Sequence, residues 1–215
     1  MNYFVEGLQG SGKSTLVKRL SEKHPNYTAI HEGDYSPVEL AWCAYVDRET
    51  YKQILEKYEI YNGNLDSETF RDIVLRRFKN WQGDNNIFEC SIFQNIIEDM
   101  ILFQKCSDEE IVDFYKQIKE VLADKPYEIV YLQADDIKSN IDIIRKERSD
   151  DQGNEMWFPL MLGYFDNSPY ALEKGVKGTE ALLEHFKHRQ ELELRICEEL
   201  FPERNIMLRS KKYKI

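Results

Sequence analysis

The segment GLQGSGKST, residues 7–15, constrains the fold of this chain more than any other feature. From Gly7 to Ser14 it fits the pattern G-x-x-x-x-G-K-[ST]. A short apolar run at residues 3–5 precedes it and predicts a strand, while the apolar spacing in residues 14–23 predicts a helix. A strand, a glycine-rich turn and a helix in this order are the context in which the pattern forms a phosphate-binding loop.

The residue types of this loop explain how it would hold phosphate. Glycines let successive backbone N–H groups point inward, and the helix N-terminus adds unsatisfied N–H groups and partial positive charge. We expect Lys13 to reach the β- and γ-phosphates and the Ser14 hydroxyl to take a Mg²⁺ position. The alternative is a glycine-rich turn without a ligand, which the flanking strand and helix disfavour. The predicted nucleotide-binding residues are Gly7, Gly10, Ser11, Gly12, Lys13, Ser14 and Thr15, with ATP and Mg²⁺ as cofactors.

Strands and helices are predicted to alternate along the chain. The predicted strands are residues 3–5, 27–34, 85–90, 127–133 and 205–209, and the predicted helices are 14–23, 91–103, 107–122, 135–148 and part of 175–200, with two or three more within 37–81. This alternation predicts an α/β fold of the P-loop NTPase type, a three-layer α/β/α arrangement with a five-stranded parallel sheet and a helical lid. The 215 residues suit a single domain, residues 1–215, with an acceptor-binding helical region at about 35–81 and a lid at about 145–156.

Composition excludes several classes of partner. The net charge is −10, and the only basic block is RSKKYK near the end, so a nucleic acid polymer is not expected as a ligand. No apolar run approaches 18 residues and no charged-then-apolar leader is present, so we expect no membrane association. The four cysteines are scattered, without a C-x-x-C pair, which is typical of reduced thiols. We therefore expect a cytoplasmic protein, and a homodimer is compatible with this composition.

Carboxylates stand at the ends of two predicted strands, where parallel α/β sheets bind ligands. Glu32 and Asp34 follow the second strand, and Glu89 follows the third. Beside a phosphate-binding loop such a carboxylate either holds Mg²⁺ or takes a proton from the attacking hydroxyl. We assign Glu89 to the metal, with a helix cap as the alternative, and Glu32 or Asp34 to the role of base. His31 is expected to be structural.

Two arginines, Arg145 and Arg148, are three residues apart on one helical face, directly before the polar break at 149–154. In a phosphotransferase, guanidinium groups at this position would close over the phosphoryl group in transfer and neutralise its charge. The alternative is a solvated basic face at a helix C-terminus, which the helix dipole also favours. We interpret both arginines as catalytic lid residues.

Together these segments resemble the P-loop kinases of small molecules, and in particular the deoxynucleoside kinase and thymidylate kinase-like group. The resemblance rests on GLQGSGKST, NIFECSIFQN, IVYLQA and RKERSDDQG and covers residues 1–148. It implies transfer of the ATP γ-phosphoryl group with Mg²⁺, a catalytic-base glutamate at Glu32, and lid arginines at Arg145 and Arg148. Two departures stand out, because Cys90 replaces the arginine of the family's Glu-Arg-Ser segment and Arg71 replaces a glutamine that reads the base.

The acceptor pocket is expected between the second and third strands. Its predicted ligand-binding residues are Tyr35, Trp42 and Arg71, because aromatic rings stack on planar ligands and a guanidinium can bind a phosphate. Each aromatic taken alone suits a core position better than a ligand contact, and Arg71 also suits a solvated helix face. Nucleoside, nucleotide and other hydroxyl-bearing acceptors all stay open.

Two other functions are considered. A nucleotide-dependent ATPase or switch that acts on a protein partner would share the loop, but the chain has neither a guanine-specific Asn-Lys-x-Asp motif nor a Leu-Ser-Gly-Gly-Gln segment. A P-loop protein that only binds is disfavoured by the intact Lys13, Ser14 and Glu89. We therefore predict an ATP-dependent phosphotransferase that acts on a small molecule.

Overall fold

A five-stranded parallel sheet forms the centre of the protein, which we describe from a computed structural model over residues 1–31 and 66–212. The strands in this part of the chain are β1 (Asn2–Gly7), β2 (Thr28–Ile30), β3 (Asn86–Glu89), β4 (Tyr127–Gln133) and β5 (Asn205–Arg209). Their order across the sheet is β2-β3-β1-β4-β5, and every neighbouring pair is parallel. The predicted α/β fold with five parallel strands is confirmed.

The helices within the described residues are α1 (Lys13–Lys23), α3 (Ser67–Asn80), α4 (Gln94–Leu102), α5 (Asp108–Val121), α6 (Ile137–Glu147), α7 (Trp157–Asp166), α8 (Pro169–Lys174) and α9 (Gly178–Leu200). The predicted helices 14–23, 91–103, 107–122 and 135–148 are confirmed as α1, α4, α5 and α6. Ser107 caps α5 with the capping box expected from its sequence. The helices α7 and α8 were not predicted.

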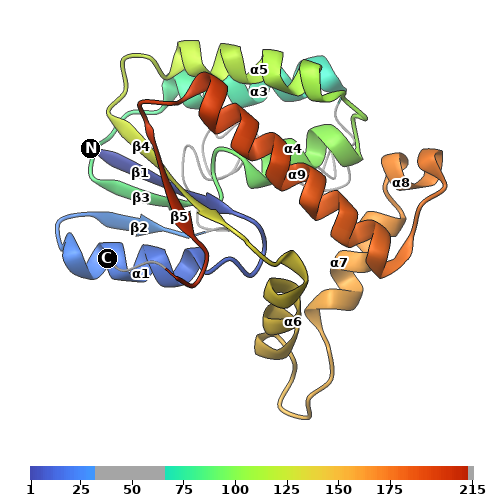
Figure 1. Ribbon diagram of the computed structural model, residues 1–215. Coiled ribbons are helices and arrows are strands. Elements are labelled where there is room, and N and C mark those ends of the chain that lie inside the picture. The colour runs from blue at the N-terminus through green and yellow to red at the C-terminus, as the bar shows by residue number, and fades with distance from the viewer. Residues whose placement is uncertain (32–65, 213–215) are drawn as a thin grey trace, which may run out of the picture.

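The two faces of the sheet carry unequal layers (Figure 1). On one face α1 packs Leu16, Val17 and Leu20 against Val5 and neighbouring strand residues. On the other face α3, α4, α5 and α9 cover a larger apolar cluster, which contains Phe4 and Phe88 among its fully buried rings. Both faces of the central strands are therefore covered, as the near-continuous apolar runs of β1 and β4 require.

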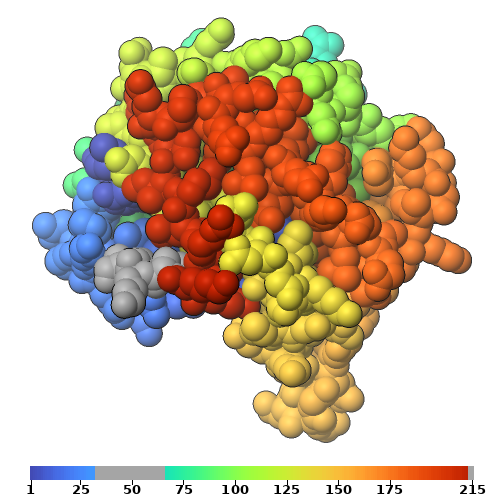
Figure 2. All heavy atoms as spheres, in the orientation of Figure 1, coloured from blue at the N-terminus to red at the C-terminus, as the bar shows by residue number. Residues whose placement is uncertain are grey.

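The chain leaves the sheet after β4 to form α6, a hairpin-like connection and α7. A single antiparallel bridge joins Ser149 to Glu155 within this connection. Figure 2 shows the connection projecting from the lower edge of the molecule. The predicted lid at about 145–156 corresponds to the end of α6 and this connection. Among the described residues, no helix combines the length and the apolar character needed to cross a membrane.

Candidate active site

The phosphate-binding loop joins β1 to α1 with three glycines in left-handed or related conformations. Gly7, Gly10 and Gly12 have φ values of +135°, +73° and +97°. A Cβ atom on Gly7 would lie 2.6 Å from the Leu132 carbonyl oxygen, and one on Gly10 would lie 2.6 Å from that of Asn140. Glycine is therefore required at both positions by conformation and by space. Lys13 begins α1, so its backbone lies at the positive end of the helix dipole.

The Lys13 ammonium group is buried inside the loop. Its Nζ donates to the carbonyl oxygens of Gly7 at 2.8 Å and Leu8 at 2.9 Å. It also donates to Oε1 of Gln94, at the start of α4, at 3.0 Å. These acceptors hold a positive charge at the position where the loop would enclose phosphate oxygens.

Glu89 lies at the end of β3 in contact with the loop. Ser14 Oγ donates to Glu89 Oε1 at 2.5 Å, and His31 Nδ1 lies 2.8 Å from Glu89 Oε2. Cys90 follows with φ +60°, a left-handed conformation that is uncommon for cysteine and turns the chain sharply after Glu89. The predicted metal ligands Ser14 and Glu89 are thus side by side, and His31, expected to be only structural, contacts the same carboxylate.

This pair of oxygen ligands fits a magnesium ion. Mg²⁺ prefers oxygen ligands and takes only one or two from the protein, with water and substrate phosphates completing its coordination. The Ser14 hydroxyl and the Glu89 carboxylate supply that number beside the loop. The described residues hold no group of three or more His, Cys, Asp or Glu side chains suited to a metal, so a site built wholly from protein ligands is not found among them.

A cavity of about 790 Å³ opens over the loop at the carboxyl ends of the strands. Loop residues form its floor, α4 forms one wall, and α6 and α7 form another. Residues that line it include Gln9, Lys13, Ser14, Arg19, Glu89, Asn95, Glu98, Asp99, Glu147, Arg148, Trp157, Tyr164 and Lys211. Its volume lies within the range typical of small-molecule sites.

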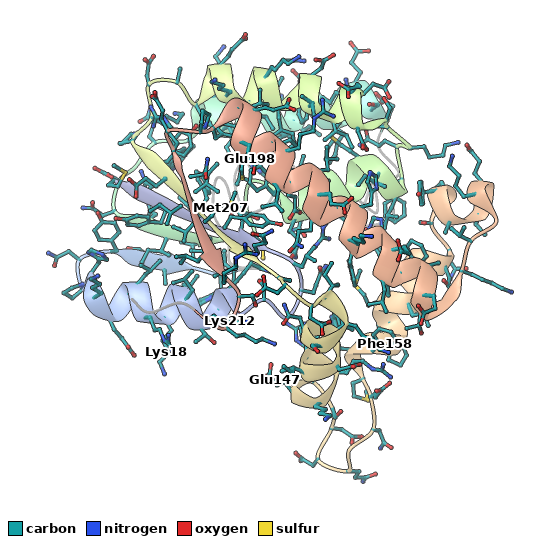
Figure 3. All side chains as sticks on the ribbon, viewed as in Figure 1. Lys18, Glu147, Phe158, Glu198, Met207 and Lys212 are labelled. Carbon is teal, nitrogen blue, oxygen red and sulfur yellow. The ribbon has the colours of Figure 1, made fainter. Side chains whose placement is uncertain are left out.

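The two lid arginines are placed differently. Arg148 lines the cavity, with its guanidinium 5.6 Å from the centre of the Trp157 ring. Arg145 pairs with Glu155 through bonds of 2.8 and 3.0 Å and lies 4.2 Å from the centre of the Phe158 ring. Figure 3 labels Phe158 where α7 begins beside α6. Arg145 is not among the described residues that line the cavity.

Most residues of the predicted acceptor site and both candidate bases lie outside the part of the chain that the structure describes. Glu32, Asp34, Tyr35 and Trp42 lie outside the described residues. Arg71 lies on α3, half-buried, with Nη2 3.6 Å from Cys106 Sγ and its guanidinium 5.6 Å from the centre of the Phe114 ring. Arg71 is not among the described residues that line the cavity, so its predicted contact with a substrate stays a prediction.

Three buried carboxyl groups near the loop were missed by the sequence prediction. Burial raises the pKa of Glu6 to about 7, although the backbone N–H groups of Ile92 and Gln94 donate to it. Burial also raises the pKa of Asp99 to about 7. Burial acts in the same direction on Glu98, but the attraction of Arg189 and His185 and the hydrogen bonds from both side chains together outweigh it and lower that pKa to about 2.

These three carboxyl groups differ in how well the sequence could have revealed them. Glu6 could have been found by the reasoning that selected Glu89, because it also follows an apolar strand. Glu98 and Asp99 lie inside the predicted helix 91–103, where two adjacent acids give no such signal.

The family model of the deoxynucleoside kinases matches residues 3–157. No curated protein matches the chain. Among solved structures it is similar to deoxyadenosine kinase from M. mycoides with bound dATP, at 19% identity and a TM-score of 0.44, covering 99% of this chain and 93% of that chain. It is also similar to deoxyadenosine kinase from M. mycoides with the products dCMP and a flexible dCDP bound, at 14% identity and a TM-score of 0.43, covering 99% and 92%.

Proposed function

The chain belongs to the deoxynucleoside kinase family and is a kinase that moves a phosphoryl group from a nucleotide to a nucleoside, and from this premise we propose that the donor is ATP with Mg²⁺ and that the γ-phosphoryl group goes to a nucleoside hydroxyl. The loop residues 7–15 would hold the donor phosphates through backbone N–H groups. Lys13 would exchange its present carbonyl partners for phosphate oxygens.

One observation carries this proposal, namely the contact between Ser14 and Glu89 beside the buried Lys13 ammonium. A hydroxyl, a carboxylate and an ammonium group thereby line the same cavity of about 790 Å³. Phosphoryl transfer requires mainly positioning and charge stabilisation, and these three groups supply both. Ser14 and Glu89 would hold Mg²⁺, which when bound neutralises charge on the phosphates.

The lid would contribute cations and exclude water. Arg148 lines the cavity and would stabilise charge on the phosphoryl group during transfer. Arg145 would act beside it, and its bonds to Glu155 support the connection between α6 and α7. We propose Glu32 or Asp34 as the base that takes the hydroxyl proton. The support is that His31, which directly follows β2 and precedes both residues, contacts Glu89.

The acceptor would lie within the single kinase-like domain, against the helical region at about 35–81. Tyr35, Trp42 and Arg71 are the residues proposed to contact it. The resemblance places a base-reading glutamine at position 71, so an arginine there would change which acceptor groups are recognised. An arginine suits a hydrogen-bond acceptor or an anion, since it has five N–H donors and no acceptor.

The experiment that tests this function is ADP release from ATP-Mg²⁺, with and without a panel of nucleosides, nucleoside monophosphates and hydroxylated antibiotics. We expect one or more nucleosides to stimulate ADP release strongly. A response to monophosphates alone would overturn the proposed acceptor. Slow hydrolysis that no small molecule stimulates would overturn the proposed transfer and favour an ATPase that acts on a protein partner.

A further inference from the structure

Arg189 on α9 is a buried arginine that contacts the phosphate-binding loop through Gln9. Its side chain has no exposed surface. Its Nη2 donates to Gln9 Oε1 at 2.6 Å, and its Nη1 donates to Glu98 Oε2 at 2.5 Å. Its Nε lies 3.2 Å from Oε1 of Glu193, one turn further along α9. One side chain therefore connects the loop, α4 and α9, which are far apart in the sequence.

The partners of Arg189 are themselves held by other elements. His185 Nε2 lies 2.9 Å from Glu98 Oε2, and the Tyr131 hydroxyl of β4 donates to Glu193 at 2.5 Å. Because Glu98 and Glu193 are both buried beside it, the guanidinium charge is compensated within the protein interior. Removal of Arg189 or of one of the two glutamates would leave a buried charge without its partner, which is strongly destabilising. The three side chains are therefore held in one geometry.

The α9 helix is fixed at the same edge of the sheet as the loop. Gln190, next to Arg189, accepts from the Ala134 backbone N–H at 2.8 Å and donates to the Ala134 carbonyl at 3.0 Å. Ala134 directly follows β4, whose Leu132 carbonyl limits the space at Gly7. The α9 helix thus gives Arg189 a rigid base close to the loop.

Both side chains that Arg189 holds by the shortest bonds line the cavity, since Gln9 and Glu98 belong to its wall. Gln9 lies between Gly7 and Gly10, the two glycines whose surroundings leave no room for a side chain. A bond that fixes Gln9 consequently restricts the backbone whose N–H groups would face phosphate. Hydrogen bonds from a charged donor are stronger than neutral ones, which suits this task.

We propose that Arg189 is a positioning residue that holds the loop in its phosphate-binding conformation through Gln9, an inference that rests on the proposed binding of ATP to residues 7–15. Arg189 itself does not touch the nucleotide. Its loss should weaken donor binding, because part of the binding free energy would then be spent on ordering the loop. The acceptor should bind with little change.

The test is a double-mutant cycle on the dissociation constant of MgATP, measured by calorimetry. The variants are Gln9→Ala, Arg189→Lys and the pair, with Arg195→Lys as the matched control. Arg195 lies on the same helix but is partly exposed and pairs with Glu109 and Glu199. We expect each single variant to weaken MgATP binding about tenfold, and the double variant to be no weaker than either one, because both remove the same contact.

Several outcomes would overturn the inference. Effects of the two substitutions that multiply would show that Gln9 and Arg189 act independently. A lowered unfolding temperature with unchanged MgATP affinity would reduce Arg189 to a structural role. Should Arg189→Lys not fold, the Gln9→Ala variant alone tests the inference. A dissociation constant of this variant for MgATP within twofold of that of the unmodified protein would exclude the proposed role of the contact. Failure of the unmodified protein to bind MgATP would overturn the proposed function as well, whereas normal binding with independent effects overturns only the role of Arg189.

Discussion

The phosphate-binding loop, residues 7–15, and the lid, residues 145–156, both contribute charged groups to one cavity, but different forces hold them in place. Lys13 is buried and bonded to two backbone carbonyls and a glutamine. Arg148 is exposed, and its guanidinium lies over the Trp157 ring. Buried, fully bonded groups cannot move without breaking hydrogen bonds, whereas exposed ones can.

This difference teaches how the two regions would share the work of catalysis. The loop is formed in advance, so little of the donor's binding free energy is lost in ordering it. The lid is held by surface ion pairs such as Arg145 with Glu155, which contribute little to stability, so it can open and close at low cost. Changes in the loop should affect binding, turnover or stability strongly, and changes in the lid should affect turnover more than stability.

The largest effect is expected from Lys13→Ala in the loop. Loss of one preorganised cation should lower kcat by about 10³-fold or more, which corresponds to roughly 4 kcal/mol. The thermal unfolding temperature should stay close to that of the unmodified protein, because no buried carboxylate loses its ion-pair partner. The measurement is ADP release at saturating nucleoside, together with a melting curve followed by circular dichroism.

Lys18→Ala is the matched control for this variant. Lys18 is exposed on the same helix, α1, and Figure 3 shows it on the side away from the sheet. Its removal should leave kcat unchanged. Normal turnover in the Lys13 variant would remove the loop from the mechanism.

The next effect concerns the point where the two regions touch. A Cβ atom on Gly10 would lie 2.6 Å from the Asn140 carbonyl oxygen of α6, the helix that leads into the lid. Gly10→Ala should therefore destabilise the protein by roughly 3 kcal/mol, from the left-handed backbone and from the displacement of α6. Urea unfolding measures this loss.

Gly153→Ala separates the two causes. Gly153 also has a positive φ, +83°, but a Cβ atom there would meet nothing within 4 Å. Its substitution should cost only about 1 kcal/mol, from the backbone conformation alone. Equal losses in the two variants would contradict the steric argument at Gly10.

A smaller effect should distinguish the two lid arginines. Arg148→Ala should lower kcat about a hundredfold, because Arg148 lines the cavity. Arg145→Ala should lower it about tenfold, since Arg145 is bonded to Glu155 and would act by holding the connection. Neither should change the unfolding temperature by more than a few degrees. A larger loss in the Arg145 variant would exchange the two assigned roles.

The parts of the fold that could be predicted from sequence are those with local signals. The loop, the central strands and the capping box at Ser107 each depend on residues close together in the chain, and all three are confirmed. The helices α7 and α8 were not predicted, because WFPLMLGYFD has no polar face to give a period and contains both a proline and a glycine.

The site was predictable where a local motif or a strand end gave a rule. The strand-end rule selected Glu89, and the structure places it against Ser14. The Arg189 cluster depends on residues 9, 98, 189 and 193 meeting in space, and no spacing in a single sequence reveals such a meeting. From sequence alone, arginine and glutamate on a helix predict a solvated face, because charged side chains are almost never fully buried unless they are paired. Only the packing of the helix shows that these are buried.

The last effect is a pH dependence of stability that arises from a buried carboxyl group next to the loop. Because burial raises the folded-state pKa of Glu6 from about 4.5 to about 7, the folded protein holds this proton more tightly than the unfolded chain. The contribution is fully present below pH 4.5 and is lost as pH rises through 7. Between pH 5 and pH 7 the loss should be on the order of 2 kcal/mol.

Glu6→Gln isolates this contribution, because glutamine does not titrate and keeps one oxygen for the N–H groups of Ile92 and Gln94. From pH 5 to pH 7 the unmodified protein should lose about 2 kcal/mol of unfolding free energy relative to the Glu6→Gln variant. Asp99 titrates in both proteins and cancels. Glu22→Gln, an exposed change on α1, should show no such shift. A constant difference across this range would mean that Glu6 is ionised throughout, and the buried region behind the loop would then be as polar as the lid.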